Sequence, residues 1–221
     1  MVLNIPGSGI LTSTLNVISQ SLLIPVIVLL LVFVVYAVIT IGSLISEYSS
    51  RKKVPISTMK NLIRDISLAE NSDIAKNAIN SSEIPEKQKE DLLDLISSED
   101  LSKESREALA RKIIENEENL IDKILEKTDI MARIGPTLGL MGTLIPMGPG
   151  LAALGSGDVT GLANAIIVAF DTTVVGIGAG AIGYFVSKIR KRWYDDYLSN
   201  FDALSDAVLD FMKKKISKLM F

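Results

Sequence analysis

Apolar positions gather in three long stretches, and a block rich in charged residues separates the first stretch from the other two. Residues 22–45 contain 24 consecutive positions without a charged side chain. A helix rises about 1.5 Å per residue and the hydrocarbon core of a bilayer is about 30 Å thick, so this stretch can span a membrane. Residues 134–154 and 162–186 are also apolar but richer in glycine. The pattern predicts an all-α polytopic membrane protein with three transmembrane helices; the alternative is a soluble domain that buries the last two stretches.

The charged block, residues 46–133, has apolar side chains at helical spacing and predicts a helical domain. Nothing interrupts residues 102–133 before Gly135, so this helix is expected to continue into the second transmembrane helix. Residues 187–221 contain no Pro or Gly, which predicts that the third transmembrane helix continues in the same way. The apolar sets are Ile56, Met59, Ile63 and Ile66; Leu92, Leu93, Leu95 and Ile96; Leu109, Ile113, Leu120, Ile124 and Ile130; and Tyr194, Tyr197, Phe201, Leu204, Val208, Phe211 and Ile216.

Basic residues lie beside the three stretches in an asymmetric way. They follow the first stretch at 51–53, precede the second at Arg133 and follow the third within 188–192, whereas the connector 155–161 has only Asp158. Basic residues beside membrane spans favour the cytoplasmic side. We therefore expect a multi-pass protein of the cell (inner) membrane, with residues 1–21 and the hairpin 155–161 outside, and 46–133 and 187–221 in the cytoplasm.

The composition excludes several kinds of chemistry. The chain of 221 residues has no Cys and no His, so disulfides, thiolate or imidazole metal ligands and histidine-based catalysis are absent. We expect no enzyme activity, no metal and no cofactor. The formal net charge is −3, and no basic patch interleaved with aromatic residues indicates nucleic-acid binding.

Glycines at spacings of three and four recur in the second and third stretches. Small residues at such spacing allow membrane helices to approach closely. The first stretch has no comparable pattern, and its bulky Leu, Val and Ile surface suits lipid. We expect the second and third helices to form a protein-facing pair through Gly135, Gly139, Gly142, Gly176, Gly180 and Gly183, with the first helix outside them.

Asp171 is an acidic residue in the middle of the third stretch, beside Thr172 and Thr173. A carboxyl group costs a few kcal/mol or more in hydrocarbon, and such groups often mark ion pathways. Two interpretations remain open: a structural carboxyl that is protonated or hydrogen-bonded to a neighbour, or an ion-binding group. By helical rise, Thr143 and Thr173 lie at one depth, about 17 Å from the outer ends of their spans. A threonine can also bond only to its own helix backbone.

Three segments resemble one known family. Residues 138–147, LGLMGTLIPM, are similar to the LGLLGTVxGM signature of the ExbB/TolQ/MotA proton-channel family. Residues 154–166, LGSGDVTGLANAI, resemble its outside hairpin, and 169–177, AFDTTVVGI, its AxxxTxxGL core. Pro146 and Asp171 depart from the family pattern, because Gly-like and apolar or small residues are usual there.

The resemblance implies a channel-forming stator subunit that couples proton or sodium flow to mechanical work. It implies a homo-oligomer, most often a pentamer, around a single-span partner of the ExbD/TolR/MotB type. It also implies that Thr143 and Thr173 line the ion path, to which we add Asp171 and Thr172 as candidates. The alternative function is a non-conducting membrane scaffold or receptor subunit that binds partners through its cytoplasmic helices.

Overall fold

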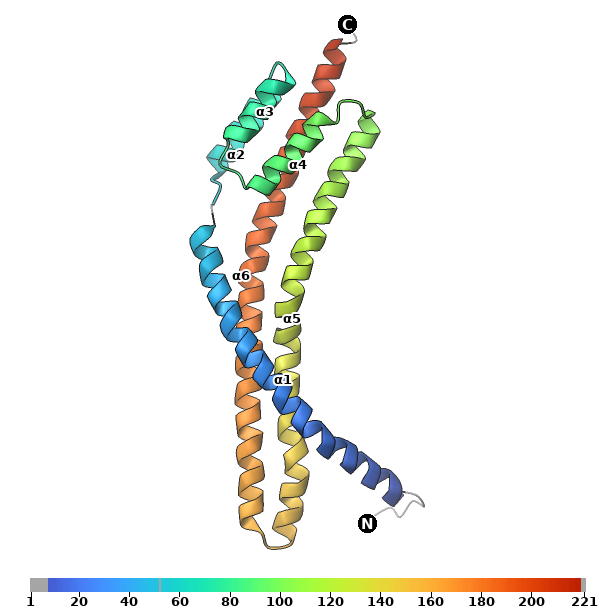
Figure 1. The fold of residues 1–221 in the computed structure, drawn as a ribbon, viewed down its shortest axis with the longest axis vertical. Helices are drawn as coiled ribbons and strands as arrows, with labels where there is room; N and C mark the ends of the chain where they lie inside the picture. Colours follow the sequence, from blue (N-terminus) through green and yellow to red (C-terminus); the bar gives the residue numbers. More distant parts are fainter. Residues whose placement is uncertain (1–7, 52, 220–221) are drawn as a thin grey trace. The chain divides into compact units, whose positions relative to one another are not determined.

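The computed structural model describes residues 8–51 and 53–219, and in this part of the chain every regular element is an α-helix. The six helices are α1 (Ser8–Ser50), α2 (Ile56–Ser67), α3 (Ser72–Ser81), α4 (Glu86–Ser97), α5 (Lys103–Gly155) and α6 (Val159–Leu219) (Figure 1). Of these, α1, α5 and α6 are long and apolar enough to cross a membrane. The predicted all-α fold with three transmembrane helices is confirmed.

Helices α5 and α6 each continue from an apolar stretch into a charged one without a break. α5 joins the predicted helix of residues 102–133 to the second apolar stretch, and it stays helical through Pro136, Pro146 and Pro149. α6 joins the third stretch to the C-terminal helix in one element of 61 residues. The predicted extension of both transmembrane helices is therefore confirmed.

The chain divides into two compact units. The span unit comprises Met1–Ser46 and Glu126–Ile189, and the charged unit comprises Glu47–Leu125 and Arg190–Phe221. The helices do not mark the edges of a bilayer, so the predicted boundaries of the spans stay predictions. Residues 1–7 of the predicted outside segment, Lys52 and residues 220–221 lie outside the described residues, as does the side chain of Ile216.

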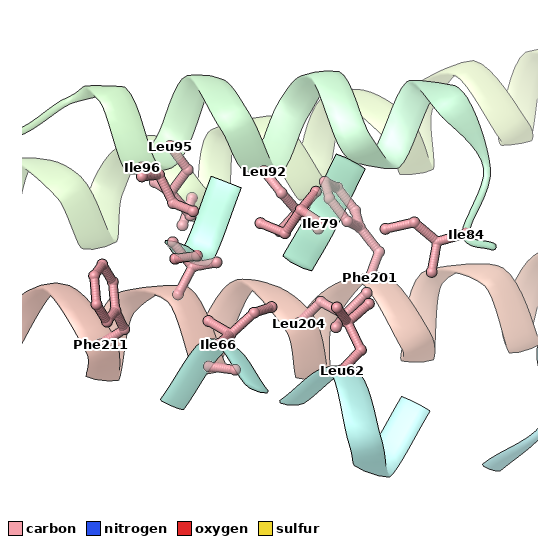
Figure 2. Close-up of a cluster of buried hydrophobic side chains, with 14 of the residues drawn as sticks. Leu62, Ile66, Ile79, Ile84, Leu92, Leu95, Ile96, Phe201, Leu204 and Phe211 are labelled. Atoms are coloured by element: carbon pink, nitrogen blue, oxygen red, sulfur yellow. The ribbon is translucent and has the colours of Figure 1, made fainter. Parts of the chain in front are cut away.

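The charged unit packs around one apolar core. Leu92, Leu95 and Ile96 of α4 meet Phe201 and Leu204 of α6, and side chains of α2, α3 and α5 complete the cluster (Figure 2). Leu92, Ile96 and Leu204 are fully buried. The apolar stripe predicted for the C-terminal helix is the part of α6 that enters this core, at Phe201, Leu204, Val208 and Phe211.

Helix α3 is an element that the apolar pattern did not predict. It has only two fully buried positions, Ala75 and Ile79, which are too few to give a clear helical period. Its start is fixed by a polar group instead, because the side chain of Asn71 accepts a hydrogen bond from the backbone N–H of Ile74 at 2.9 Å. This is the capping arrangement that satisfies a free N–H at a helix start.

In the span unit, α5 and α6 form an antiparallel hairpin. The turn between them contains Gly157 with a positive φ of 88°, a conformation that glycine adopts readily. Asp158 follows, and its carboxylate accepts a hydrogen bond from the backbone N–H of Gly161 at 2.8 Å at the start of α6. α1 contacts this hairpin through Val26 and Leu30, which pack against Leu138 and Ile145 of α5.

Candidate functional site

The hairpin of α5 and α6 is held together by glycines that bring the two backbones close. A methyl group on Gly176 would lie 2.6 Å from the carbonyl oxygen of Gly135 and 2.7 Å from Cα of Gly139. A methyl group on Gly180 would lie 2.6 Å from Cδ of Pro136. A real Cβ would push the α5 backbone away at Gly176 and the Pro136 ring away at Gly180, so only glycine allows this approach.

The glycine contacts continue toward both ends of the hairpin. A methyl group on Gly183 would lie 2.9 Å from the backbone nitrogen of Ala132 and from the carbonyl oxygen of Thr128. At Gly142 the same group would lie 2.5 Å from Cβ of Thr172. All six glycines singled out in the sequence thus lie in the contact between α5 and α6.

This register puts the candidate threonines at one level of the hairpin. Gly142 of α5 faces Thr172 of α6, and their chain neighbours are Thr143 and Thr173. Thr172 is 7 % exposed, whereas Thr143 and Thr173 are partly buried. The structure therefore brings Thr143, Thr172 and Thr173 together along the helix pair.

Each of the three hydroxyl groups donates to the backbone of its own helix. Thr143 Oγ1 donates to the carbonyl of Leu140 at 2.7 Å, and Thr173 Oγ1 to that of Ala169 at 2.9 Å. Thr172 Oγ1 lies within hydrogen-bond distance of two carbonyls, those of Val168 at 2.9 Å and Ala169 at 3.0 Å. A hydroxyl that donates to its backbone still has lone pairs that can accept from water or a protonated group. The partly exposed hydroxyls of Thr143 and Thr173 can therefore accept a hydrogen bond from a group that approaches them, whereas that of Thr172 is buried against α5.

Asp171 lies on another face of α6. Its side chain is exposed on the single chain, as are those of Asn164 and Val174 on the same helix. Among the described residues, Asp171 has no hydrogen-bond or ion-pair partner, while its neighbour Thr172 is buried against α5. A carboxyl group on an apolar helix face is stable only when water, an ion or a polar group reaches it. The described part of the chain supplies no such polar group to Asp171.

Asp129 and Ser187 form a polar contact in the span unit that the sequence did not reveal. The hydroxyl of Ser187 on α6 donates to a carboxylate oxygen of Asp129 on α5. Both residues are partly or fully buried, and Thr128 beside them is fully buried. In the sequence, Asp129 is one of many charged residues of the block 46–133. Only the antiparallel register, which brings residue 129 opposite residue 187, identifies the pair.

Among the described residues, no group of carboxylates is arranged to hold a metal ion. What the span unit offers is a set of hydroxyl acceptors, one exposed carboxyl group and a closely packed helix pair. A carboxyl group is able to exchange a proton, and carboxyl and hydroxyl oxygens are chemically able to coordinate a monovalent cation.

Comparison with known proteins agrees with this arrangement. No curated protein matches the chain. The family model of the MotA/TolQ/ExbB proton channel family matches residues 69–203, more than half of the chain. The matched region runs from the start of α3 into the charged part of α6, so it includes the whole α5–α6 hairpin. The chain is a multi-pass membrane protein that belongs to the MotA/TolQ/ExbB proton channel family.

Proposed function

We propose that the chain is the channel-forming stator subunit of a motor complex driven by protons or sodium ions. Family membership supports a channel-like stator subunit. The observation that carries the proposal for this chain is the exposed carboxyl group of Asp171 on an apolar helix that carries two candidate threonines. Intramembrane acids of this kind usually serve ion movement.

The proposed complex is a ring of identical subunits, five by resemblance to the family, around a single-span subunit of the ExbD/TolR/MotB type. Large apolar side chains of the hairpin, such as Leu144, Phe170 and Val174, are exposed on the single chain, which supports contact with lipid or other subunits. We propose the inner membrane as its location, with the N-terminus outside and the C-terminus in the cytoplasm, because the basic residues lie on one side of all three spans.

Within this complex, Thr143, Thr172 and Thr173 supply hydroxyl oxygens along the ion path. Asp171 has a different task, because it lies away from the α5 contact and Thr172 lies in it. We assign Asp171 to a seam between subunits, where it receives a proton or pairs with a cation on the way to the partner's carboxylate. No part of this proposal involves enzyme catalysis.

The test compares ion flux between the wild type and its variants. Each complex is purified through a tag on the chain and reconstituted into vesicles. A proton gradient or a sodium gradient is imposed, and a dye specific for each ion is read. We expect flux of one ion in the wild type. Asp171→Asn and Asp171→Leu should lower it about tenfold or more, because neither side chain carries a titratable group. Thr173→Val should lower it less.

Val174→Thr is the matched control, since Val174 is an exposed neighbour that adds no titratable group when changed. The mass of the complex is measured for every variant, so that loss of assembly is separated from loss of flux. Full ion flux in Asp171→Asn would contradict the proposed ion-binding role. Asp171 would then serve only to form hydrogen bonds where the helices pack.

The alternative is a scaffold that conducts nothing. It is favoured by the threonine hydroxyls, which all donate to their own backbone and need no ion to be satisfied. A wild-type ring of unchanged mass that passes neither ion would support this function.

A further inference from the structure

The charged unit contains a cavity that the ion path does not use. Its volume is about 1190 Å³. Its walls come from the end of α1, the segment between α1 and α2, the start of α2, the start of α4 with Pro85 before it, and residues 192–200 of α6. This is at or above the size of a pocket for a drug-sized molecule. All the lining residues belong to the charged unit.

The charged side chains of the cavity leave an excess of positive charge. Glu47 is neutralised, because Arg190 Nε lies 2.9 Å from one of its oxygens and the Tyr194 hydroxyl donates to the other at 3.1 Å. Three cationic residues line the walls, namely Arg51, Lys53 and Arg192. Only Asp196 opposes them, and its carboxylate is mostly exposed and 3.9 Å from Arg51. The cavity therefore suits an anion.

Arg51 is held in place by an aromatic residue. Its guanidinium group lies 5.1 Å from the centroid of the Trp193 ring, and Nη2 donates to the Trp193 carbonyl at 3.0 Å. Tyr48 packs against the same indole, with ring centroids 6.0 Å apart. Lys53 and Arg192 form no ion pair with any described residue, so their charges are available to a ligand.

The rest of the lining is mixed. Val54, Ile56 and Pro85 form an apolar part of the wall, and Ser50, Gln88, Ser199 and Asn200 are polar. Two wall segments come soon after an apolar span in the chain: residues 47–51 and 53–56 after the first span, and residues 192–200 after the third. Tryptophan, tyrosine and basic residues just beyond a span are typical of the level of lipid headgroups. A small soluble anion would use the basic residues but leave the apolar wall uncovered.

We propose that this cavity binds the phosphate headgroup of an anionic phospholipid, with Arg51, Lys53 and Arg192 around the phosphate and the apolar wall against the glycerol and upper chains. Basic pockets beside transmembrane helices commonly take such headgroups. The proposal does not depend on ion conduction, since a scaffold with the same fold would bind the lipid equally.

Trp193 makes the cavity directly observable, because it is the only tryptophan in the chain. The purified full-length protein in detergent is titrated with short-chain phosphatidylglycerol, and Trp193 emission is recorded. Short-chain phosphatidylcholine and glycerol 1-phosphate are titrated in parallel. We expect a saturable change with phosphatidylglycerol and a much weaker one with the other two compounds.

Lys53→Gln and Arg192→Gln should each weaken phosphatidylglycerol binding about fivefold, and the double variant about 25-fold. Neither residue contacts the indole in the way Arg51 does, so the starting emission should be preserved. Lys213→Gln is the control, since it removes an exposed basic residue of the same unit far from the lining set. The helical content of each variant is checked by circular dichroism.

Three results would overturn the proposal. An absent response to phosphatidylglycerol would mean that the cavity does not bind it. Equal weakening of phosphatidylglycerol binding by Lys213→Gln would mean that net charge, and not the cavity, determines the affinity. Equal binding of glycerol 1-phosphate would make the ligand a soluble phosphate and not a lipid.

Discussion

The two units of this chain reach stability in different ways. The charged unit buries large apolar side chains from five helices in one core. The span unit joins α5 to α6 through glycines, and in the most apolar windows of α1, α5 and α6 only 17 %, 33 % and 28 % of the residues are buried within the chain. The charged unit is thus complete in one copy of the chain, whereas the span unit is complete only with lipid or further subunits around it.

The difference follows from the surroundings that each unit is built for. In water, burial of apolar surface drives packing, at roughly 25 cal/mol per Å². Lipid chains are as apolar as leucine, so apolar burial contributes little between membrane helices, and close backbone contact has to supply the attraction. The glycines of α5 and α6 are the counterpart of Leu92, Phe201 and Leu204 in the charged unit.

The largest effect is expected from Gly176→Leu in the span unit. The new side chain would meet backbone atoms of Gly135 and Gly139, which cannot move without separating the helices. Ordinary overpacking, in which side chains can shift, costs about 1–3 kcal/mol. Here backbone atoms would have to move, so we expect a larger cost and loss of the folded complex. Size-exclusion chromatography and thermal unfolding in detergent measure it.

Gly178→Leu is the matched control, because a methyl group there meets no atom of the chain within 4 Å. It should leave the unfolding temperature of the helix pair unchanged, even if a bulky residue there affects subunit contacts. Equal damage from both variants would show that the α5–α6 contact is not what holds the span unit together.

A smaller but still large effect is expected from Phe201→Ala in the charged unit. Phe201 is 1 % exposed at the centre of the core, and truncation of a buried Phe costs about 3–5 kcal/mol. Val32→Ala on α1 is the contrasting change, because Val32 is 54 % exposed and should cost less than about 0.5 kcal/mol. Thermal unfolding of both variants measures the contrast, and similar costs would contradict it.

The sequence predicted the long helices well. The length of an apolar stretch is a local property, and so is the absence of Pro and Gly from residues 102–133 and 187–221. It predicted the buried face of α5 less well. Leu120, Ile124 and Ile130 were expected in the apolar stripe but are exposed on the single chain, whereas Ile121, Leu125 and Met131 are buried. α5 has two apolar faces, and periodicity cannot tell which one packs within the chain.

The same limit applies at the candidate site. The sequence located Asp171 and the threonines within a span, because an acid or hydroxyl group is conspicuous among apolar residues. It could not tell that the hydroxyls bond to their own helix, and no pattern along one chain reveals the groups that meet Asp171 from outside it. Ile56 is a simpler example: it opened the predicted apolar face of α2, yet it lies in the first turn and is 87 % exposed, and Leu62 is buried instead.

The smallest effect concerns a polar group inside the charged unit and depends on pH. The Tyr197 hydroxyl donates to Glu117 Oε2 at 3.2 Å, and the side chain of Gln88 donates to the Tyr197 carbonyl at 2.9 Å. Burial raises the pKa of Tyr197 well above its ordinary value near 10, and the carboxylates of Glu117 and Asp91 raise it further. Lys87 bonds to Asp91 at 2.9 Å and is the nearby cation.

A tyrosine whose pKa is raised by folding stabilises the protein fully below the pKa of the unfolded chain. Above about pH 10 the unfolded chain ionises first, so this stability is lost as the pH rises toward the folded pKa. We expect Tyr197→Phe to make the loss of stability above pH 10 less steep. At pH 7 the same change should cost about 1–3 kcal/mol, because Glu117 loses its hydrogen bond, and its other oxygen has no partner among the described residues. Tyr184→Phe, at an exposed residue of the span unit, should change neither value. Thermal unfolding between pH 7 and pH 11 measures both.

An unchanged alkaline slope in Tyr197→Phe would mean that the charged unit opens locally and exposes Tyr197 before it unfolds. The core of the charged unit would then not be closed within one chain, and the contrast with the span unit would fail.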